Sequence, residues 1–184
     1  MITYLSLLRG INVSGQKSIK MGDLKVLYEK LGFSKTQTYI QSGNVIFQSE
    51  QDVMQLVTKI EQAIPLQYGF DVAVQVIPAS ELVLAARDNP FLKEPLVDHA
   101  TLHLTFLATK PSDSMLSNLA TDPRFVDEYR VLGSLIYLKC PNGYGKTKFT
   151  NAYFESKLKV KATTRNWKTV LKVIELTQSI DDLI

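Results

Sequence analysis

Residues 36–48 read Thr-Gln-Thr-Tyr-Ile-Gln-Ser-Gly-Asn-Val-Ile-Phe-Gln, and this stretch decides the fold that we predict. Both of its halves are rich in β-branched and aromatic residues, which favour strands, and Ser42-Gly43 between them is typical of a turn. The stretch therefore predicts a β-hairpin with strands at residues 36–41 and 44–48. The sequence on either side of the hairpin indicates the fold to which it belongs.

One order of elements surrounds this hairpin. A short apolar strand is predicted at residues 3–9, and a strand that ends at Pro78 is predicted at residues 71–77. Between them, apolar residues recur at helical spacing before and after the hairpin. These positions are Met21, Leu24, Leu27, Tyr28 and Leu31, and then Val53, Leu56, Val57, Ile60 and Ile64. We expect Gly32 to end the first helix, and Ser49 with Asp52 to form a capping box for the second. The order strand, helix, strand, strand, helix, strand is that of the split βαβ, or ferredoxin-like, unit.

The second half of the chain repeats this order after a linking helix at residues 80–87. We expect strands at 99–109, 125–132, 134–139 and 160–164, helices at 112–120 and 147–158, and a last helix that begins near Trp167 with Asn166 as its N-cap. The sequence therefore predicts an α+β protein of two tandem ferredoxin-like (split βαβ) subdomains. The predicted division is 1–78, a linking helix and loop at 79–98, and 99–184, which includes the extra C-terminal helix.

Composition restricts the class of protein. The chain has 184 residues, of which 45% are hydrophobic and 9% aromatic, so it can bury a sizeable core and is not disordered. We find no apolar run of the roughly 20 residues that a bilayer needs, and no signal peptide at the N-terminus. The single cysteine, Cys140, excludes an internal disulfide framework. We expect a soluble cytoplasmic protein with no membrane partner.

The net charge of +3 conceals two basic segments. Residues 1–35 hold six basic and two acidic residues, and residues 139–172 hold nine and one, whereas residues 36–138 hold six and twelve. If the fold brings the two basic segments together, they form a surface that attracts anions. The alternative is that the lysines solvate exposed helix faces.

The loop after the first strand is a candidate anion clamp. It runs for about eleven residues, whereas such loops usually take about two to six. It contains no acidic residue and leads into a helix N-terminus, where backbone N–H groups favour anions. Its candidate ligand-binding residues are Arg9, Asn12, Gly15, Lys17 and Lys20. The alternative is a surface loop whose glycines only make turns.

A second basic loop, Cys-Pro-Asn-Gly-Tyr-Gly-Lys-Thr at residues 140–147, nearly matches a Walker A motif. Cys140 stands where the first glycine belongs, so we reject a true P-loop. A weaker prediction remains, in which Gly143, Gly145, Lys146, Thr147 and Lys148 open a helix and hold an oxyanion. The alternative is a Gly-rich turn before a solvated helix. Further along, Arg165 is a candidate for a forked contact with phosphate or carboxylate, and Asn166 is a candidate ligand contact as well as a cap.

Three segments resemble one family of proteins. They are residues 7–15 (Leu-Leu-Arg-Gly-Ile-Asn-Val-Ser-Gly), residues 39–47 (Tyr-Ile-Gln-Ser-Gly-Asn-Val-Ile-Phe), and the stretch that runs from residues 141–149 to residues 162–167. In this order they are similar to the domain-of-unknown-function 1697 family of small, mainly bacterial proteins. Two departures are mild: Ser14 replaces a glycine, and Thr-Lys-Phe at 147–149 replaces Ser-Lys-Leu.

The resemblance implies a cytoplasmic protein of two ferredoxin-like subdomains, and it implies no activity. It is also the reason to include Gln41, Ser42 and Asn44 among the ligand-binding candidates. The other interpretation of these three residues is ordinary turn chemistry at the tip of a hairpin.

Together these features predict a protein that binds an anionic small molecule, such as a nucleotide or phosphorylated metabolite, through its two basic loops. This hypothesis requires Arg9, Lys146 and Arg165 to converge in the folded chain. No general base or nucleophile is identifiable, so whether the protein is an enzyme stays open, and we expect no cofactor. We expect no metal site either, because His99 and His103 would lie about 13 Å apart on a strand.

Two other classes of function stay open. Residues 139–172 interleave five aromatic residues with nine basic ones, which is compatible with a single-stranded nucleic-acid binder, although the RNP1 pattern is absent and Trp167 is expected in the core. A protein–protein interaction module is the third option. The sequence does not indicate an oligomeric state.

Overall fold

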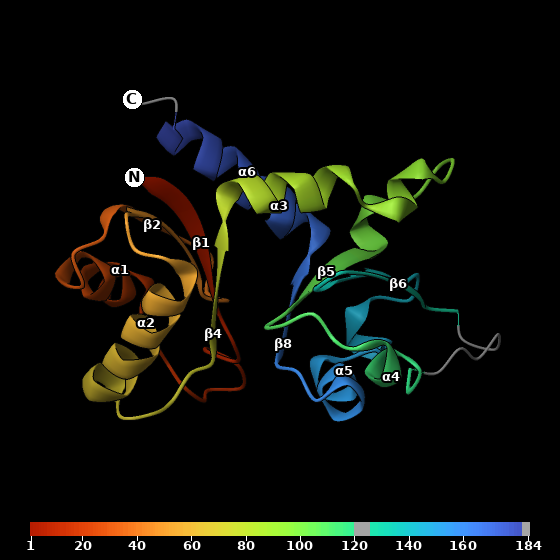
Figure 1. The fold of residues 1–184 in the computed structure, drawn as a ribbon, viewed down its shortest axis with the longest axis horizontal. Coiled ribbons are helices and arrows are strands. Elements are labelled where there is room, and N and C mark those ends of the chain that lie inside the picture. The colour runs from red at the N-terminus through yellow and green to blue at the C-terminus, as the bar shows by residue number, and fades with distance from the viewer. Residues whose placement is uncertain (120–125, 182–184) are drawn as a thin grey trace. The chain divides into compact units, whose positions relative to one another are not determined.

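The computed structural model of this protein describes residues 1–119 and 126–181. Within these residues it is a mixed α+β protein with two four-stranded antiparallel sheets and six α-helices (Figure 1). The contacts group the chain into two units, which are Met1–Leu84 with Lys172–Ile184, and Ala85–Leu171. This grouping differs from the predicted division at 78 and 99, because the second half of the last helix belongs with the first unit.

The first unit contains one sheet with the strand order β2-β3-β1-β4. Its elements are β1 (Ile2–Leu8), α1 (Met21–Lys30), β2 (Ser34–Tyr39), β3 (Asn44–Ser49), α2 (Val53–Tyr68) and β4 (Val74–Pro78). The predicted strands and helices of this half are thus present, with their ends shifted by a few residues.

Local signals fix the ends of the two helices of this unit. Ile19 and Leu24 flank the start of α1 and are both buried, as in a hydrophobic staple. The predicted capping box of Ser49 and Asp52 is wrong. Instead, Asp52 caps α2 by accepting a hydrogen bond from the Gln55 backbone N–H at 2.9 Å, and the Gln55 side chain accepts from the Asp52 N–H at 3.2 Å. The box lies three residues further on because Ser49 is still the last residue of β3.

The sheet of the first unit is buried on both faces. One face packs beneath α1 and α2, where the rings of Tyr4, Tyr28 and Phe47 are in contact and Ser6 Oγ lies 2.7 Å from Tyr28 Oη. The other face buries Leu5 and Leu7 completely or nearly so.

The second half of the last helix, α6 (Trp167–Asp181), belongs to this first unit. Val173, Thr177 and Ile180 recur at helical spacing along it and are buried. Lys35 in β2 donates from Nζ to the Ile180 carbonyl at 3.2 Å, and this places a cation at the carbonyl end of the helix, where its dipole favours one.

The second unit contains a sheet with the strand order β6-β7-β5-β8. Its strands are β5 (Leu102–Leu107), β6 (Glu128–Leu132), β7 (Leu135–Lys139) and β8 (Ala162–Asn166). Its helical elements are α3 (Ala79–Arg87), which enters from the first unit, α4 (Asp113–Leu116), α5 (Asn151–Leu158), the first half of α6, and three short 3-10 turns at Pro90–Lys93, His99–Thr101 and Tyr144–Lys146. No described helix is both long enough and apolar enough to cross a membrane.

Several predicted boundaries in this unit are wrong for local reasons. The strand expected from residue 99 begins at Leu102, because Asp98 caps a 3-10 turn over His99–Thr101. The helix expected at 112–120 is a single turn over Asp113–Leu116, and residue 120 lies outside the described residues. The strand expected at 125–132 begins at Glu128 among the described residues, which exclude residue 125.

The two units share equivalent hydrogen bonds. The Leu8 N–H donates to the Gly43 carbonyl at 2.8 Å in the first unit, and the Leu107 N–H donates to the Ser134 carbonyl at 2.8 Å in the second. A glutamate in the second helix of each unit also accepts from the first N–H of the last strand, at 2.9 Å in both cases. These pairs are Glu61 with Val74 and Glu155 with Ala162.

The long connections of the two units lie in different places. In the first unit the long connection joins β1 to α1, whereas in the second unit it joins β7 to α5. The end of β1 pairs with the start of β3 through Leu7 and Asn44, while the end of β7 pairs with the start of β5 through Lys139 and Leu102. The two basic loops therefore occupy opposite ends of their respective sheets, relative to the first strand of each unit.

Gly43 provides a test of how tightly the hairpin tip packs. A Cβ at Gly43 would lie 2.7 Å from Ile11 Cδ1 and 2.8 Å from Leu8 Cβ, and Gly43 has a left-handed φ of 75°. We expect Gly43→Ala to lower the free energy of unfolding by about 3 kcal/mol, measured by urea denaturation. Gly15→Ala is the control, because Gly15 has a similar φ of 74° but open space around it, so only the backbone strain of about 1 kcal/mol applies. Equal losses in the two variants would contradict the close packing.

Candidate functional site

The loop between β1 and α1 is closed by the side chain of Asn12. Asn12 Oδ1 accepts from the Ile19 N–H at 2.8 Å, and Nδ2 donates to the Ile19 carbonyl at 3.0 Å. The side chain thereby imitates a strand neighbour of Ile19. The same Nδ2 donates to the Gln41 carbonyl at 2.9 Å, which joins the loop to the hairpin tip. Asn12 thus holds the loop in shape, a role that the prediction of a ligand contact did not foresee.

The hairpin residues have a similar internal role. Asn44 is fully buried, and its Nδ2 donates to the Tyr39 carbonyl and to Ser42 Oγ, both at 3.0 Å. The hydrogen bonds of Asn44 and Ser42 therefore shape the turn between β2 and β3. The structure brings Asn12 and Gln41 together and assigns both, with Ser42 and Asn44, to the framework of the loop.

The tip of the loop is exposed, basic and conformationally constrained. Asn12, Ser14 and Lys17 have left-handed φ angles of 56°, 50° and 47°, and Gly15 has one of 74°. Residues other than glycine rarely adopt this conformation, so the surrounding contacts must enforce it. Lys17 Nζ donates to the Asp71 carbonyl at 2.7 Å, using one of the three N–H bonds of its ammonium group.

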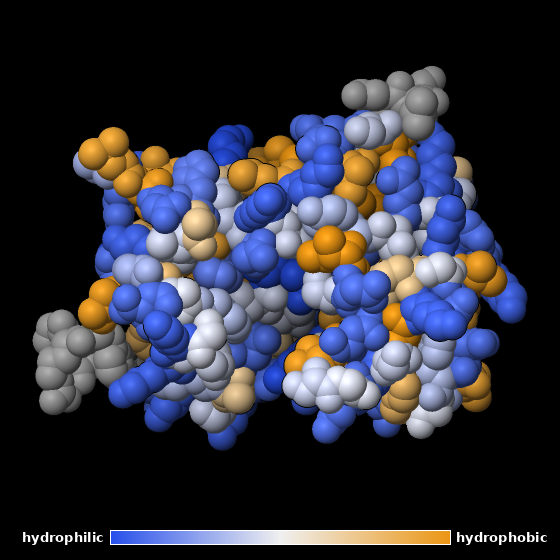
Figure 2. Space-filling view, turned by 180° about the vertical axis from the view of Figure 1, so that it is seen from behind, coloured by the Kyte–Doolittle hydropathy of each residue, from blue (hydrophilic) through white to orange (hydrophobic). Residues whose placement is uncertain are grey.

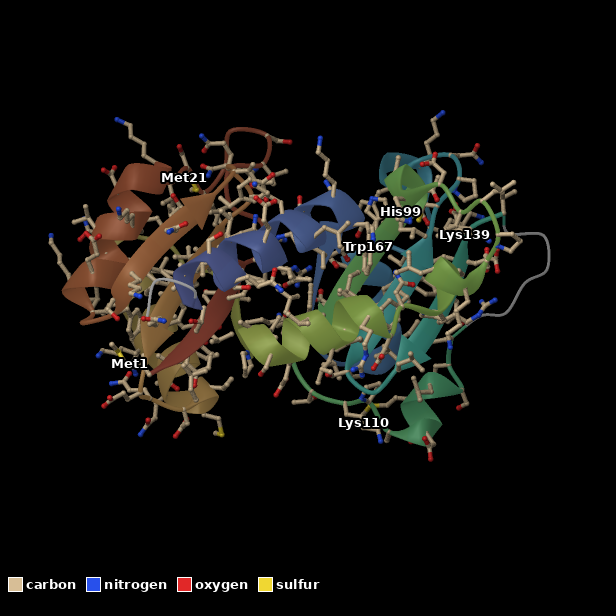
Figure 3. The ribbon with its side chains drawn as sticks, turned by 90° about the horizontal axis from the view of Figure 1, so that it is seen from above. Met1, Met21, His99, Lys110, Lys139 and Trp167 are labelled. Atoms are coloured by element: carbon tan, nitrogen blue, oxygen red, sulfur yellow. The ribbon has the colours of Figure 1, made fainter. Side chains whose placement is uncertain are left out.

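The loop leads into a helix that has no side-chain cap. Lys20 occupies the N-cap position of α1, a position where Ser, Thr, Asp or Asn usually accepts a hydrogen bond, and its side chain makes no such bond. The N–H groups of the first turn, beginning at Met21 (labelled in Figure 3), thus point out of the helix beside an exposed lysine. One acidic residue, Asp23, lies in this turn. Arg9, at the other end of the loop, is half-buried, and its backbone N–H donates to the Ala73 carbonyl at 3.0 Å.

The second basic loop does not open a helix, so that part of the prediction is wrong. Helix α5 begins at Asn151, with Thr150 Oγ1 accepting from the Tyr153 N–H at 3.2 Å. Before it, Gly143 with a φ of 86° starts a 3-10 turn, and Thr147 Oγ1 accepts from the Phe149 N–H at 3.1 Å. Four candidate residues, Gly143, Gly145, Lys146 and Lys148, are exposed on this loop, and a long helix N-terminus is not part of their surroundings.

The last strand supplies the other two candidate residues. Arg165 lies opposite Leu104 on β8, the edge strand, and Nη1 donates to the Thr164 carbonyl at 3.0 Å. Burial lowers the pKa of Arg165 to about 10, so the guanidinium still carries its charge at neutral pH. Asn166 Oδ1 accepts from the Thr169 N–H at 2.7 Å, so the predicted capping role of Asn166 is confirmed. Trp167, labelled in Figure 3, is buried as expected.

The convergence of the two basic loops stays a prediction. Arg9, Lys17 and Lys20 belong to the first unit, whereas Lys146 and Arg165 belong to the second. Within the first unit, one loop carries all three cations.

A histidine–tyrosine pair in the second unit was missed by the sequence analysis. His103 in β5 is buried, and its ring stacks on that of Tyr144 with 5.0 Å between the ring centroids. Its Nδ1 lies 3.2 Å from the Thr101 carbonyl, which can only accept, so the proton of the neutral ring is on Nδ1. The sequence gave no sign of this pair, because 41 residues separate its members.

Cys140 has no chemical role of its own in this loop. Its thiol is fully buried, and burial raises its pKa to about 11, so it stays protonated at neutral pH. A protonated, inaccessible thiol is not a nucleophile.

Comparisons with known proteins give a family and a fold. The sequence model of a family described as "Protein of unknown function (DUF1697)" matches residues 1–137. The solved structure of the conserved bacterial protein SP0830 from Streptococcus pneumoniae is similar, with a TM-score of 0.72 and 25% sequence identity. The similarity covers 97% of this chain and 99% of that one. Among curated proteins, none matches this chain.

Asn12 provides a test of the closed loop. Asn12→Ala removes three hydrogen bonds that close the loop, so we expect the free energy of unfolding to fall by about 2 to 3 kcal/mol in urea denaturation. Ser14→Ala is the control, because Ser14 is exposed in the same loop and has a similar left-handed φ. We expect that substitution to change stability by less than about 0.5 kcal/mol. A loss as large as that of Asn12→Ala would refute the special role of Asn12.

His103 is expected to make the stability of the protein depend on pH. Burial lowers the pKa of His103 below the 6.5 of an exposed histidine, so the unfolded chain binds a proton more readily. The contribution of His103 is complete above pH 6.5 and is lost as the pH falls through the folded pKa. Urea denaturation between pH 7.5 and 5 should show this loss, and His103→Gln should reduce it. His99→Gln, at an exposed position, should leave the pH profile as it is.

Proposed function

The chain belongs to the DUF1697 family of proteins of unknown function, and from this premise we propose that it binds an anionic small molecule at the loop between β1 and α1. The observation that carries this proposal is the entry of a constrained, basic loop into an uncapped helix. The ligand would be a phosphate- or carboxylate-bearing molecule such as a nucleotide or phosphorylated metabolite.

The geometry of the loop supports anion binding in two ways. The first-turn N–H groups of α1 lie at the positive end of the helix dipole, which favours an anion. Lys20 is at the N-cap position, and Lys17 keeps further N–H bonds beyond the one that it donates to Asp71. Because the loop is held by Asn12 and by the buried Ile11 and Ile19, these donors are ordered before a ligand arrives.

Asp23 limits which anions would bind well. Its carboxylate lies in the first turn of α1 and competes with a ligand for the same N–H groups. A ligand must therefore carry enough negative charge to gain more from Lys17 and Lys20 than it loses to Asp23. A phosphate ester satisfies this condition better than a single carboxylate.

The proposal is tested by measuring affinity with one lysine removed at each end of the same helix. Calorimetric titration with inorganic phosphate, ribose 5-phosphate and AMP would be carried out on the whole chain. We expect Lys20→Gln to weaken binding about fivefold, since a charge at a helix N-terminus contributes about 1 kcal/mol. Lys30→Gln is the matched control, because Lys30 is exposed at the other end of α1, about 15 Å away.

A third variant and a second ligand complete this test. Asp23→Asn should tighten binding about two- to fivefold by removing the competing carboxylate. Equal losses in Lys20→Gln and Lys30→Gln, or no binding of any of the three anions, would refute the site. Binding only of a single-stranded oligonucleotide, with an affinity that falls steeply with salt, would favour the nucleic-acid alternative.

We further infer that the two units are tandem ferredoxin-like repeats. The matching strand orders, β2-β3-β1-β4 and β6-β7-β5-β8, support this inference. So do the equivalent bonds of Glu61 to Val74 and of Glu155 to Ala162. The buried free thiol of Cys140 is in keeping with a cytoplasmic location, where thiols remain reduced.

A further inference from the structure

A hollow on the outer surface of α2 carries hydrogen-bonding groups that the fold does not use. It has a volume of about 460 Å³ and lies wholly within the first unit. Its lining residues are Gln51, Met54, Gln55, Thr58, Lys59 and Gln62. It does not include the loop between β1 and α1, so this inference does not rest on the proposed function.

The polar groups of the hollow are mainly neutral amides. Gln51, Gln55, Thr58 and Gln62 follow one another at intervals of four, three and four residues, so they form a single stripe along the helix. Gln55 accepts a hydrogen bond in the capping box. Thr58 and Gln62, by contrast, make no side-chain hydrogen bond with any described residue. Each amide offers a donor and an acceptor, as a peptide group does.

Gln51 is the most unusual residue of the hollow. Its side-chain oxygen is buried and accepts no hydrogen bond within the part of the chain that the structure describes. A buried acceptor without a partner destabilises a protein unless something satisfies it. Because this oxygen has no hydrogen bond to give up, the side chain can turn into the hollow and accept one there.

An apolar group and a cation lie beside the amide stripe. Met54 is 81% exposed, and methionine is an adaptable apolar contact that occurs at peptide-binding surfaces. The Lys59 ammonium lies over the Phe33 ring, 5.5 Å from its centroid, and Lys59 is the only charged residue that lines the hollow. From Gln55 to Gln62 the helix rises by about 10 Å, which is the length of about three residues of extended chain.

We propose that this hollow binds a short extended peptide segment that has an apolar side chain for Met54 and an acidic side chain for Lys59. The amide stripe hydrogen-bonds to the peptide backbone between these two contacts. A carbohydrate fits less well, because no aromatic ring lines the hollow for a sugar to stack on. A strongly anionic ligand fits less well too, because Lys59 supplies a single charge. Elsewhere, the face shown in Figure 2 carries its apolar side chains in scattered patches among hydrophilic ones.

The test uses the whole chain, isotope-labelled for NMR, and the capped tripeptide acetyl-Leu-Gly-Glu-amide as the probe. We expect saturable shifts of the side-chain NH₂ signals of Gln51, Gln55 and Gln62. Gln51→Leu and Met54→Ala should each weaken binding about fivefold, which corresponds to one hydrogen bond or one small apolar contact. Gln51→Leu should also raise the thermal midpoint by about 2 °C, because it removes a buried acceptor that lacks a partner.

The matched control is Gln67→Leu, the same substitution at an exposed position of α2 outside the hollow. We expect it to leave the affinity for the tripeptide unchanged. Acetyl-Ser-Gly-Ser-amide, which lacks both the apolar and the acidic group, should bind more weakly than the probe. Equal effects of Gln51→Leu and Gln67→Leu, or an absence of specific shifts with acetyl-Leu-Gly-Glu-amide, would overturn the proposal.

Discussion

The close approach of the loop after β1 to Gly43 is the contact on which the rest of the first unit depends. Ile11 and Leu8 lie so near this glycine that no side chain fits there. The Leu8 N–H also donates to the Gly43 carbonyl, so the hairpin tip, the end of β1 and the loop meet at one position. Because the loop is anchored at this point, the direction in which the chain enters α1 is fixed, and with it the direction of the open N–H groups.

The sequence was sufficient to predict the strands and helices, but not the side chains that hold them together. The hairpin at 36–48 and the long amphipathic helices follow from residue type and spacing. Asn12 could not be interpreted correctly, because a polar residue in a glycine-containing loop suits a ligand contact as well as a backbone mimic. Its partners Ile19 and Gln41 are 7 and 29 residues away, and local patterns carry no information about such pairings.

The errors at helix starts have a common cause. Ser49 and Asp52 match the capping-box pattern as well as Asp52 and Gln55 do, and only the length of β3 decides between them. Thr147 and Thr150 present the same ambiguity before α5. Thr147 bonds to the Phe149 N–H and Phe149 is buried, so the chain enters the core before the helix can begin. Burial, which depends on the whole fold, chooses between caps of equal local quality. The amide stripe of α2 escaped notice because neutral polar residues on an exposed helix face are ordinary in a sequence.

The basic segments show how little a local count of charge reveals about its use. Lys139 makes ion pairs with Glu94 and Glu128, which lie in the acidic middle of the chain. Lys172 pairs with Glu175 on the same helix. A third basic residue, Lys35, serves α6. Part of the excess charge thus holds elements in place.

The closure of the first loop by Asn12 has a consequence for the speed of recognition. A loop that must fold around its ligand slows association and adds a second kinetic phase, because the slow step is the rearrangement of the chain. Here the shape is set by bonds inside the protein, so occupancy can respond as quickly as diffusion delivers the ligand. Such a loop follows rapid changes in concentration, in the manner of a sensor or a buffer, and it needs no moving part to do so.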